Sequence, residues 1–512
     1  MNTQLLYAVA AFTLFIYVTI SFVQWLRSPL RSVPGPSLAR FTDLWYFQRL
    51  KQGNFEKTNL ALHERYGSVV RYGPNRYSIN DPEASKTIYG HGTQFPKSSW
   101  YTVWQPNEDM WNTFSDRSIK RHAHNRRFYS NAYSMTSLVH YEPYLDECGN
   151  LFSQRLSEFS KVGTPVDFGH WFQCFAFDAI AMMTYGKRLG FLDRGEDINN
   201  VISNLDKSLI HSSLAGIFPS LSAFLPFLTS KLAAVFGKAQ ISYVMEFTAI
   251  RIAEERASPK PVIEANGEDG AGIGETFLSK FLSKHYQDPK EFTNYHILNG
   301  CASNMFAGSD TTGISLSAIL YFLLKTPDSM AQLREEITEF TGRGELSQNP
   351  TFKESQRMPY LQAVIKEALR IHPAVGLPLE RVVPEGGATI GGRFFPEGSI
   401  VGINSWVQHR NKALFGEDAD HFRPARWLIK DEERLSVMNR NWMPFGLGSR
   451  TCLGKNISIL EMSKLIPRIV RDFDFKLEGN ASTPGNSWKT HNAWFVKPRN
   501  FYVKIEPRKA NY

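Results

Sequence analysis

Cysteine is scarce in this chain, which has four among 512 residues. They are Cys148, Cys174, Cys301 and Cys452, and no two of them form a Cys-x-x-Cys pair. This spacing excludes a disulfide framework and fits a reducing compartment. A lone cysteine in such a chain serves as a buried apolar side chain, as a nucleophile or as a metal ligand.

Other features are also missing. The chain has no fixed-period repeat, no low-complexity tract and no compact Lys/Arg tract with interleaved aromatic residues, which argues against nucleic-acid binding. The segment "GLGSRT" lacks the third glycine of the dinucleotide fingerprint, so no nicotinamide- or flavin-binding domain is expected. The net charge of +9 favours an acidic partner or an anionic membrane.

The N-terminus carries the one long apolar run, Leu5 to Leu26, with no charged residue in it. About 20 apolar residues span a bilayer core as a helix. Because arginines follow the run and none precedes it, we expect a single-pass anchor in the endoplasmic reticulum membrane, with the body in the cytosol. Pro34 and Pro36 then indicate a stiff hinge. The expected organisation is an anchor at 1–27, a hinge and lead-in at 28–50, and one catalytic domain at 51–512.

The body is expected to be mainly α with minor β sheets. Short strands are predicted within 66–81 and a small sheet within 386–403, where glycines punctuate β-branched residues. The longest predicted helix runs from Thr293 to Lys325, which corresponds to roughly 50 Å. Its middle reads "AGSDTT", and polar groups in the middle of a buried helix cost stability unless something uses them.

The segment "FGLGSRTCLG", residues 445–454, places Cys452 in a glycine-rich turn. Glycines let a backbone turn tightly and approach a flat ligand, and Arg450 would stabilise a thiolate or pair with an anion beside it. Thiolate ligation of heme iron uses one isolated cysteine in this way. A buried structural cysteine and a catalytic nucleophile are the alternatives, although no histidine-based constellation supports the second.

The spacing F-x-x-G-x-R-x-C-x-G resembles the cysteine-loop signature of the cytochrome P450 family. Three further segments are similar to motifs of that family and occur in the same order: "AGSDTT" (307–312), "EALR" (367–370) and "FRPARW" (422–427). Other stretches resemble microsomal members from filamentous fungi that act in secondary metabolism. The resemblance covers the chain from the anchor to about residue 500 and implies the cytochrome P450 fold.

The resemblance also implies residue roles. Cys452 would be the axial ligand of the heme iron, and Phe445 would shield its sulfur from water. Asp310 and Thr311 would line the distal side and relay protons to dioxygen. A buried structural triad would consist of Glu367, Arg370 and Arg426.

Heme propionates need cations. Arg450, Arg126 and Arg381 stand where the family places its propionate ligands, and His122 replaces the tryptophan of the family's W-x-x-x-R pattern while keeping a donor. The resemblance assigns further heme contacts to Gly446, Gly454 and Ala307. Residues expected to line the substrate pocket are Trp100, Trp104, Phe306, Ala307, Gly308 and Leu377.

The implied activity is oxidation of a hydrophobic, aromatic or polycyclic secondary metabolite, by hydroxylation or epoxidation. The cofactor would be heme b, and NADPH-derived electrons would come from a cytochrome P450 reductase, with cytochrome b5 as a second donor. Two alternatives stay open at this point. One is the same fold catalysing phenol or indole coupling, or ring rearrangement, without oxygen insertion. The other is a heme-binding sensor or carrier without turnover.

Overall fold

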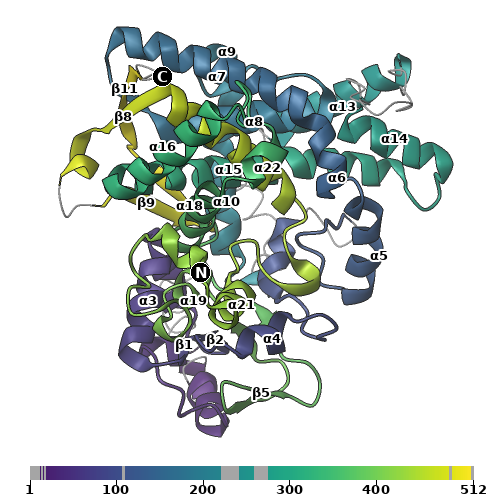
Figure 1. The fold of residues 1–512 in the computed structure, drawn as a ribbon. Coiled ribbons are helices and arrows are strands. Elements are labelled where there is room, and N and C mark those ends of the chain that lie inside the picture. Colours follow the sequence, from purple (N-terminus) through teal and green to yellow (C-terminus); the bar gives the residue numbers. More distant parts are fainter. Residues whose placement is uncertain are drawn as a thin grey trace, which may run out of the picture.

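The computed structural model describes residues 12, 15–16, 19–105, 110–220, 241–258, 275–483 and 487–508. Helices dominate the wide upper part of Figure 1, and the N-terminal strands lie in the narrower lower part. The helices are α2 (Leu44–Lys51), α3 (Phe55–Tyr66), α4 (Ala84–Tyr89), α5 (Ile119–Ser130), α6 (Met135–Leu138), α7 (Glu142–Val162), α8 (Phe168–Tyr185), α9 (Phe191–Arg194), α10 (Val201–Ala215), α13 (Ile241–Ala257), α14 (Phe277–Gln287), α15 (Asn294–Lys325), α16 (Pro327–Gly342), α17 (Phe352–Gln356), α18 (Pro359–Ile371), α19 (Ser405–Gln408), α20 (Lys412–Phe415), α21 (Glu432–Asn441) and α22 (Lys455–Asp472).

The strands are short and belong to separate small sheets. They are β1 (Val69–Gly73), β2 (Arg76–Ile79), β3 (Val166–Asp167), β4 (Arg381–Val382), β5 (Ala388–Ile390), β6 (Arg393–Phe395), β7 (Ile400–Gly402), β8 (Phe473–Leu477), β9 (Lys489–Ala493), β10 (Phe495–Arg499) and β11 (Tyr502–Pro507). The predicted mainly α architecture with minor β sheets is confirmed.

Helix α15 runs through the core and packs most extensively against α8. Thr293 caps its N-terminus in a capping box with His296, and Thr326 followed by Pro327 ends it. Since Pro cannot continue a helix, these signals fix both ends. The helix predicted over 293–325 is confirmed, with Thr293 as its cap.

The largest sheet has the strand order β1-β2-β7-β4. Antiparallel β1 and β2 pair Val69 with Ile79, and β2 runs parallel to β7, with Tyr77 opposite Val401. The strands predicted within 66–81 and 386–403 are therefore present. The sheet holds β4, which carries Arg381, beside β7 at the edge opposite β1.

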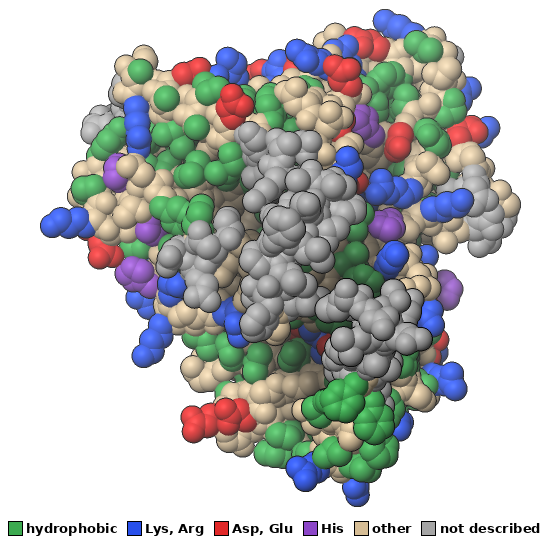
Figure 2. Space-filling model, turned by 180° about the vertical axis from the view of Figure 1, so that it is seen from behind, with side chains coloured by type: hydrophobic (Ala, Val, Ile, Leu, Met, Phe, Trp, Pro, Cys, Tyr) green, Lys and Arg blue, Asp and Glu red, His purple; other side chains and the backbone are tan. Residues whose placement is uncertain are grey.

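Much of the predicted anchor, Leu5 to Leu26, lies outside the described residues. Within the described ranges, no helix is both long enough and apolar enough to cross a membrane. Seen from behind, hydrophobic side chains gather at the lower end of the molecule (Figure 2), where Figure 1 shows the N-terminal elements. Exposed apolar residues of this part of the chain are Phe12, Phe15, Ile16, Ile20, Phe22, Val23, Leu26, Leu38 and Leu44.

Candidate functional site

The loop before α22 holds Cys452 in a tight turn. The Cys452 amide donates to the Phe445 carbonyl (2.8 Å), and the Thr451 hydroxyl donates to the same oxygen (3.2 Å). Gly446 and Gly448 have φ values of 69° and 64°. A Cβ atom at Gly448 would lie 1.7 Å from the Tyr89 carbonyl oxygen, so only glycine fits against α4 there.

The Cys452 side chain is exposed, whereas Cys148, Cys174 and Cys301 are buried. Surrounding protein nevertheless raises the pKa of the Cys452 thiol, because desolvation disfavours the thiolate. The amides of Gly454 and Lys455 and the Arg126 guanidinium act in the opposite direction. A bound metal ion would deprotonate such a thiol outright.

Helix α15 is mostly buried, but part of one face in its middle is accessible to solvent. Ala307 is exposed and Thr311, one turn later, is half-buried, with its hydroxyl donating to the Ala307 carbonyl (2.8 Å). The next residue, Thr312, forms a hydrogen bond with Ser458 of α22 (2.9 Å). This bond holds the middle of α15 next to the first turns of α22, a helix that begins three residues after Cys452.

Gly308, which the sequence assigned to the substrate pocket, lies on α15 where this helix approaches α8. A Cβ atom at Gly308 would lie 3.1 Å from Cγ1 of Ile180 in α8. The missing side chain therefore allows α8 and α15 to approach closely, which is a packing role. Phe306 is also separate from the pocket aromatics, since it packs against the main helical core.

Asp310 is buried, with its carboxylate turned toward α8 and β10. Gln173 of α8 donates to Oδ1, and Nζ of Lys497 in β10 lies 2.7 Å from Oδ2. Lys497 also contacts Asp206 of α10, and Asp206 pairs with the half-exposed Arg499 (3.2 Å). A chain of charged groups thus runs from the middle of α15 to the surface.

Four cations gather around the cysteine loop from four different segments. Arg126 comes from α5, Arg381 from β4 and Arg450 from the loop itself, and Lys97 precedes the turn Ser99–Trp104 (η2). Burial, followed by the field of the neighbouring cations, lowers the pKa of Lys97 far below its usual value and that of Arg450 to about 10. The same causes lower the pKa of buried His122 to about 3, so its imidazole is neutral.

Little negative charge balances this cluster. Arg450 donates to the Asp116 backbone carbonyl (2.6 Å), while the Asp116 carboxylate accepts two bonds from Arg121 (2.9 Å each). Lys97 lies over the rings of Tyr101 and Phe114, at 4.2 and 4.4 Å. In the described part of the chain, none of the four cations forms an ion pair with a carboxylate. The cluster is therefore suited to bind an anion carrying more than one charge.

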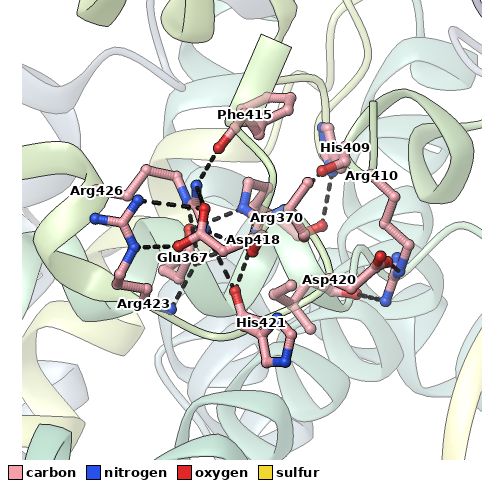
Figure 3. A network of polar contacts seen from close by, with 12 residues as sticks. Glu367, Arg370, His409, Arg410, Phe415, Asp418, Asp420, His421, Arg423 and Arg426 are labelled. Atoms are coloured by element: carbon pink, nitrogen blue, oxygen red, sulfur yellow. Dashed lines mark hydrogen bonds and ion pairs between the residues drawn. The ribbon is translucent and has the colours of Figure 1, made fainter. Parts of the chain in front are cut away.

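Glu367, Arg370 and Arg426 meet in the core between α18 and the segment Pro424–Leu428 (Figure 3). Arg370 donates to both Glu367 oxygens (2.8 Å each), and Nε of Arg426 donates to Oε1 (3.2 Å). Asp418 pairs with Arg426 (2.8 Å) and also with Arg423, so it adds a second acid to the network. The sequence did not indicate this fourth member of the network.

Aromatic side chains of the 98–111 region form a cluster with the β9–β10 turn. Trp100, Trp104 and Leu377, all assigned to the pocket from the sequence, belong to it, and so does Trp494. The Trp100 and Trp494 rings lie 4.8 Å apart, and Trp494 is buried although its φ is 81°. A tryptophan in this left-handed region is strained, so tertiary packing must hold it there.

Three residues of this arrangement were missed by sequence reasoning: Lys97, Trp494 and Lys497. Each reaches its partners through contacts between segments far apart in the chain. Lys97 offered one signal, its place three residues before Trp100, which the sequence assigned to the substrate pocket. No local pattern indicates Trp494 or Lys497.

Comparisons with known proteins agree with the motifs. The family model for cytochrome P450 matches residues 34–505. The chain is 38% identical over 503 residues to a pisatin demethylase of Fusarium vanettenii, covering 98% of this chain and 93% of that protein. It is also 38% identical to the cytochrome P450 monooxygenase cicH of Emericella nidulans, covering 97% of both chains. The cytochrome P450 monooxygenase gsfF of Penicillium aethiopicum is 33% identical, covering 94% of both.

Proposed function

The chain belongs to the cytochrome P450 family of heme-thiolate monooxygenases, and on this basis we propose that it oxidises a hydrophobic, aromatic or polycyclic secondary metabolite with dioxygen and NADPH-derived electrons. Cys452 is the proposed axial ligand of the heme iron. The observation that carries the proposal is the set of four unbalanced cations around one exposed cysteine.

The residues present fit heme b. Its two propionates would supply the missing negative charge beside Lys97, Arg126, Arg381 and Arg450, and neutral His122 would donate a further hydrogen bond. The glycines at 446 and 448 let the loop turn, and Phe445 would limit access of water to the sulfur once the heme is bound. When bound, the heme supplies the activation of dioxygen.

The remaining chemistry falls to side chains of α15. Thr311 lies beside exposed Ala307 and offers a hydroxyl there. Asp310 cannot offer its carboxylate directly, because Gln173 and Lys497 hold it on the other side of the helix. We therefore assign Thr311 the delivery of protons at its hydroxyl and Asp310 their supply from the Lys497–Asp206 pair.

The substrate class rests on the aromatic cluster. Trp100, Trp104 and Trp494 present flat apolar faces, which favour offset or edge-to-face contact with other rings. The relative named pisatin demethylase acts, by its name, on pisatin. An aromatic metabolite is the ligand that these side chains suit best.

A membrane location and a redox partner complete the proposal. The apolar segment at 5–26 and the exposed apolar residues at the lower end in Figure 2 favour a single-pass anchor in the endoplasmic reticulum membrane. Exposed basic residues near the cysteine loop favour an acidic reductase, with cytochrome b5 as a second donor: Arg117, Lys120, Arg127 and Lys455.

The test combines a spectrum with turnover. Reduced protein with carbon monoxide is expected to give the red-shifted Soret band of a thiolate-ligated heme. With reductase, NADPH, ¹⁸O₂ and a panel of aromatic fungal metabolites, one ¹⁸O atom should appear in product. A dimeric product without ¹⁸O would show that the enzyme catalyses coupling and not oxygenation. A thiolate-type band without NADPH consumption on any substrate would favour a sensor or carrier.

Lys97, the cation that the sequence did not indicate, gives a prediction. Replacing Lys97 by methionine, which has a similar volume, should lower heme affinity about tenfold, because a hydrogen bond between charged groups is lost. The rate of heme transfer to apomyoglobin measures this. Lys353→Met is the control, since Lys353 is exposed on α17 and lies outside the cation cluster, and it should leave the rate unchanged. Equal rates in wild type and Lys97→Met would remove Lys97 from the heme site.

A further inference from the structure

Glu380 is a buried acid that the proposed chemistry does not use. It precedes Arg381, and its side chain is 4% exposed. Oε1 accepts hydrogen bonds from the Tyr72 hydroxyl (2.9 Å) and from Nη1 of Arg76. Oε2 accepts one from the Ser98 hydroxyl (2.5 Å). The backbone carbonyl of Glu380 accepts from Nη1 of Arg381 (2.8 Å).

Ser98 lies between two functional regions. Its neighbour Lys97 belongs to the cation cluster and bridges to Arg381 as an isolated antiparallel pair. Two residues later, Trp100 begins the aromatic cluster, and the Trp100 amide donates to the Ser98 hydroxyl (3.3 Å). The Ser98–Glu380 hydrogen bond therefore fixes the segment that carries both a proposed propionate cation and a wall of the proposed substrate pocket.

Arg76 extends the connection to α10. Besides Glu380, it donates from Nε to Asp43 (3.2 Å) and from Nη2 to the Ile217 carbonyl just beyond α10 (3.3 Å). The Trp100 indole donates to the Ser213 carbonyl in the same helix (3.1 Å). The segment after α10 and the 98–104 turn are thus both tied, directly or through Arg76, to one carboxylate.

We propose that Glu380 is a positioning residue that holds the loop over residues 98–104 closed on the site and, through the same contact, sets Lys97 against Arg381. This inference rests on the proposed function for the identity of the pocket and of the propionate cations. The aromatic wall and Lys97 are coupled, because release of Ser98 from Glu380 displaces both. A carboxylate with three side-chain donors suits this role, because hydrogen bonds to a charged acceptor are strong and directional.

The experiment compares Ser98→Ala with wild type in the full-length, heme-loaded protein. Loss of one hydrogen bond to a charged group should raise loop opening about tenfold. Hydrogen exchange of peptides covering 99–105 should speed up by about this factor. The dissociation constant of 4-phenylimidazole, read from the heme spectrum, should rise about tenfold, while that of imidazole, too small to reach the loop, should change less than about twofold.

Tyr72→Phe is the matched control, since it removes a donor from the same carboxylate and keeps the aromatic ring in its cluster. It should leave hydrogen exchange over 99–105 at the wild-type rate. The ratio of the 4-phenylimidazole and imidazole dissociation constants should also stay at its wild-type value. Glu380→Gln should reproduce Ser98→Ala over the loop and also speed exchange at 213–218. Unchanged loop exchange in Ser98→Ala, or an equal effect of Tyr72→Phe, would overturn the inference. A wild-type protein without the thiolate-type band would instead overturn the proposed function, whatever the loop does.

Discussion

Replacing Cys452 by serine is expected to abolish the thiolate-type carbon monoxide band and to reduce turnover to the level of heme-free protein. A serine hydroxyl is deprotonated far less readily than a thiol, so it cannot supply the electron-rich sulfur ligand that favours O–O cleavage. The measurement is the reduced difference spectrum, together with NADPH-dependent product formation.

Cys148→Ala is the control for this variant. Cys148 is fully buried in the helical core, far from the cysteine loop in sequence, and its change should lower stability while leaving the band in place. A Cys452→Ser protein that kept the thiolate-type band would assign the iron to another residue. Loss of the band in folded Cys148→Ala would do the same.

Glu367→Gln is expected to lower the free energy of unfolding by about 3 to 5 kcal/mol, the range seen when one partner of a buried ion pair is removed. The amide would leave the buried guanidiniums of Arg370 and Arg426 with only Asp418 for balance. The carboxylate also accepts from the Trp427 indole (2.9 Å) and the Arg423 amide (2.9 Å), so α18 and the segment Pro424–Leu428 should loosen together. Denaturant unfolding followed by tryptophan fluorescence measures the change.

An exposed ion pair provides the comparison. Glu417 is 90% exposed and pairs with Lys412 at 3.3 Å, so Glu417→Gln should cost less than about 1 kcal/mol. Similar losses in the two variants would show that the Glu367 network contributes no more than a surface pair. Since Glu367 acts in the fold, Glu367→Gln protein that retains heme should keep the position of its Soret band.

Local signals predicted much of the fold. The limits of α15 were readable because Thr293 can cap a helix and Pro327 cannot continue one. Glu367 and Arg370 were assigned to a buried triad through the resemblance of "EALR" to a family motif, whose spacing places both residues on one helical face. The strands near 66–81 followed from the glycines and the proline that bound them.

Nonlocal contacts limited the prediction of the site. Lys97 meets Arg381, Lys497 meets Asp310 and Trp494 meets Trp100 across long stretches of sequence, and neither periodicity nor motif spacing encodes such contacts. Gly308 illustrates a different limit. From the sequence, a glycine in the central helix could leave space for a ligand or let another helix approach, and the position of Ile180 in the structure supports the second role.

The ion pair between Asp310 and Lys497 has a consequence for the order of folding. The two residues lie far apart in the sequence, so the buried acid of α15 is balanced only when β10 has reached the helix. Contacts of high sequence separation form slowly, because the entropy of closing the intervening chain must be lost first. The middle of α15 should therefore reach its final packing late in folding, after β10 has docked against it.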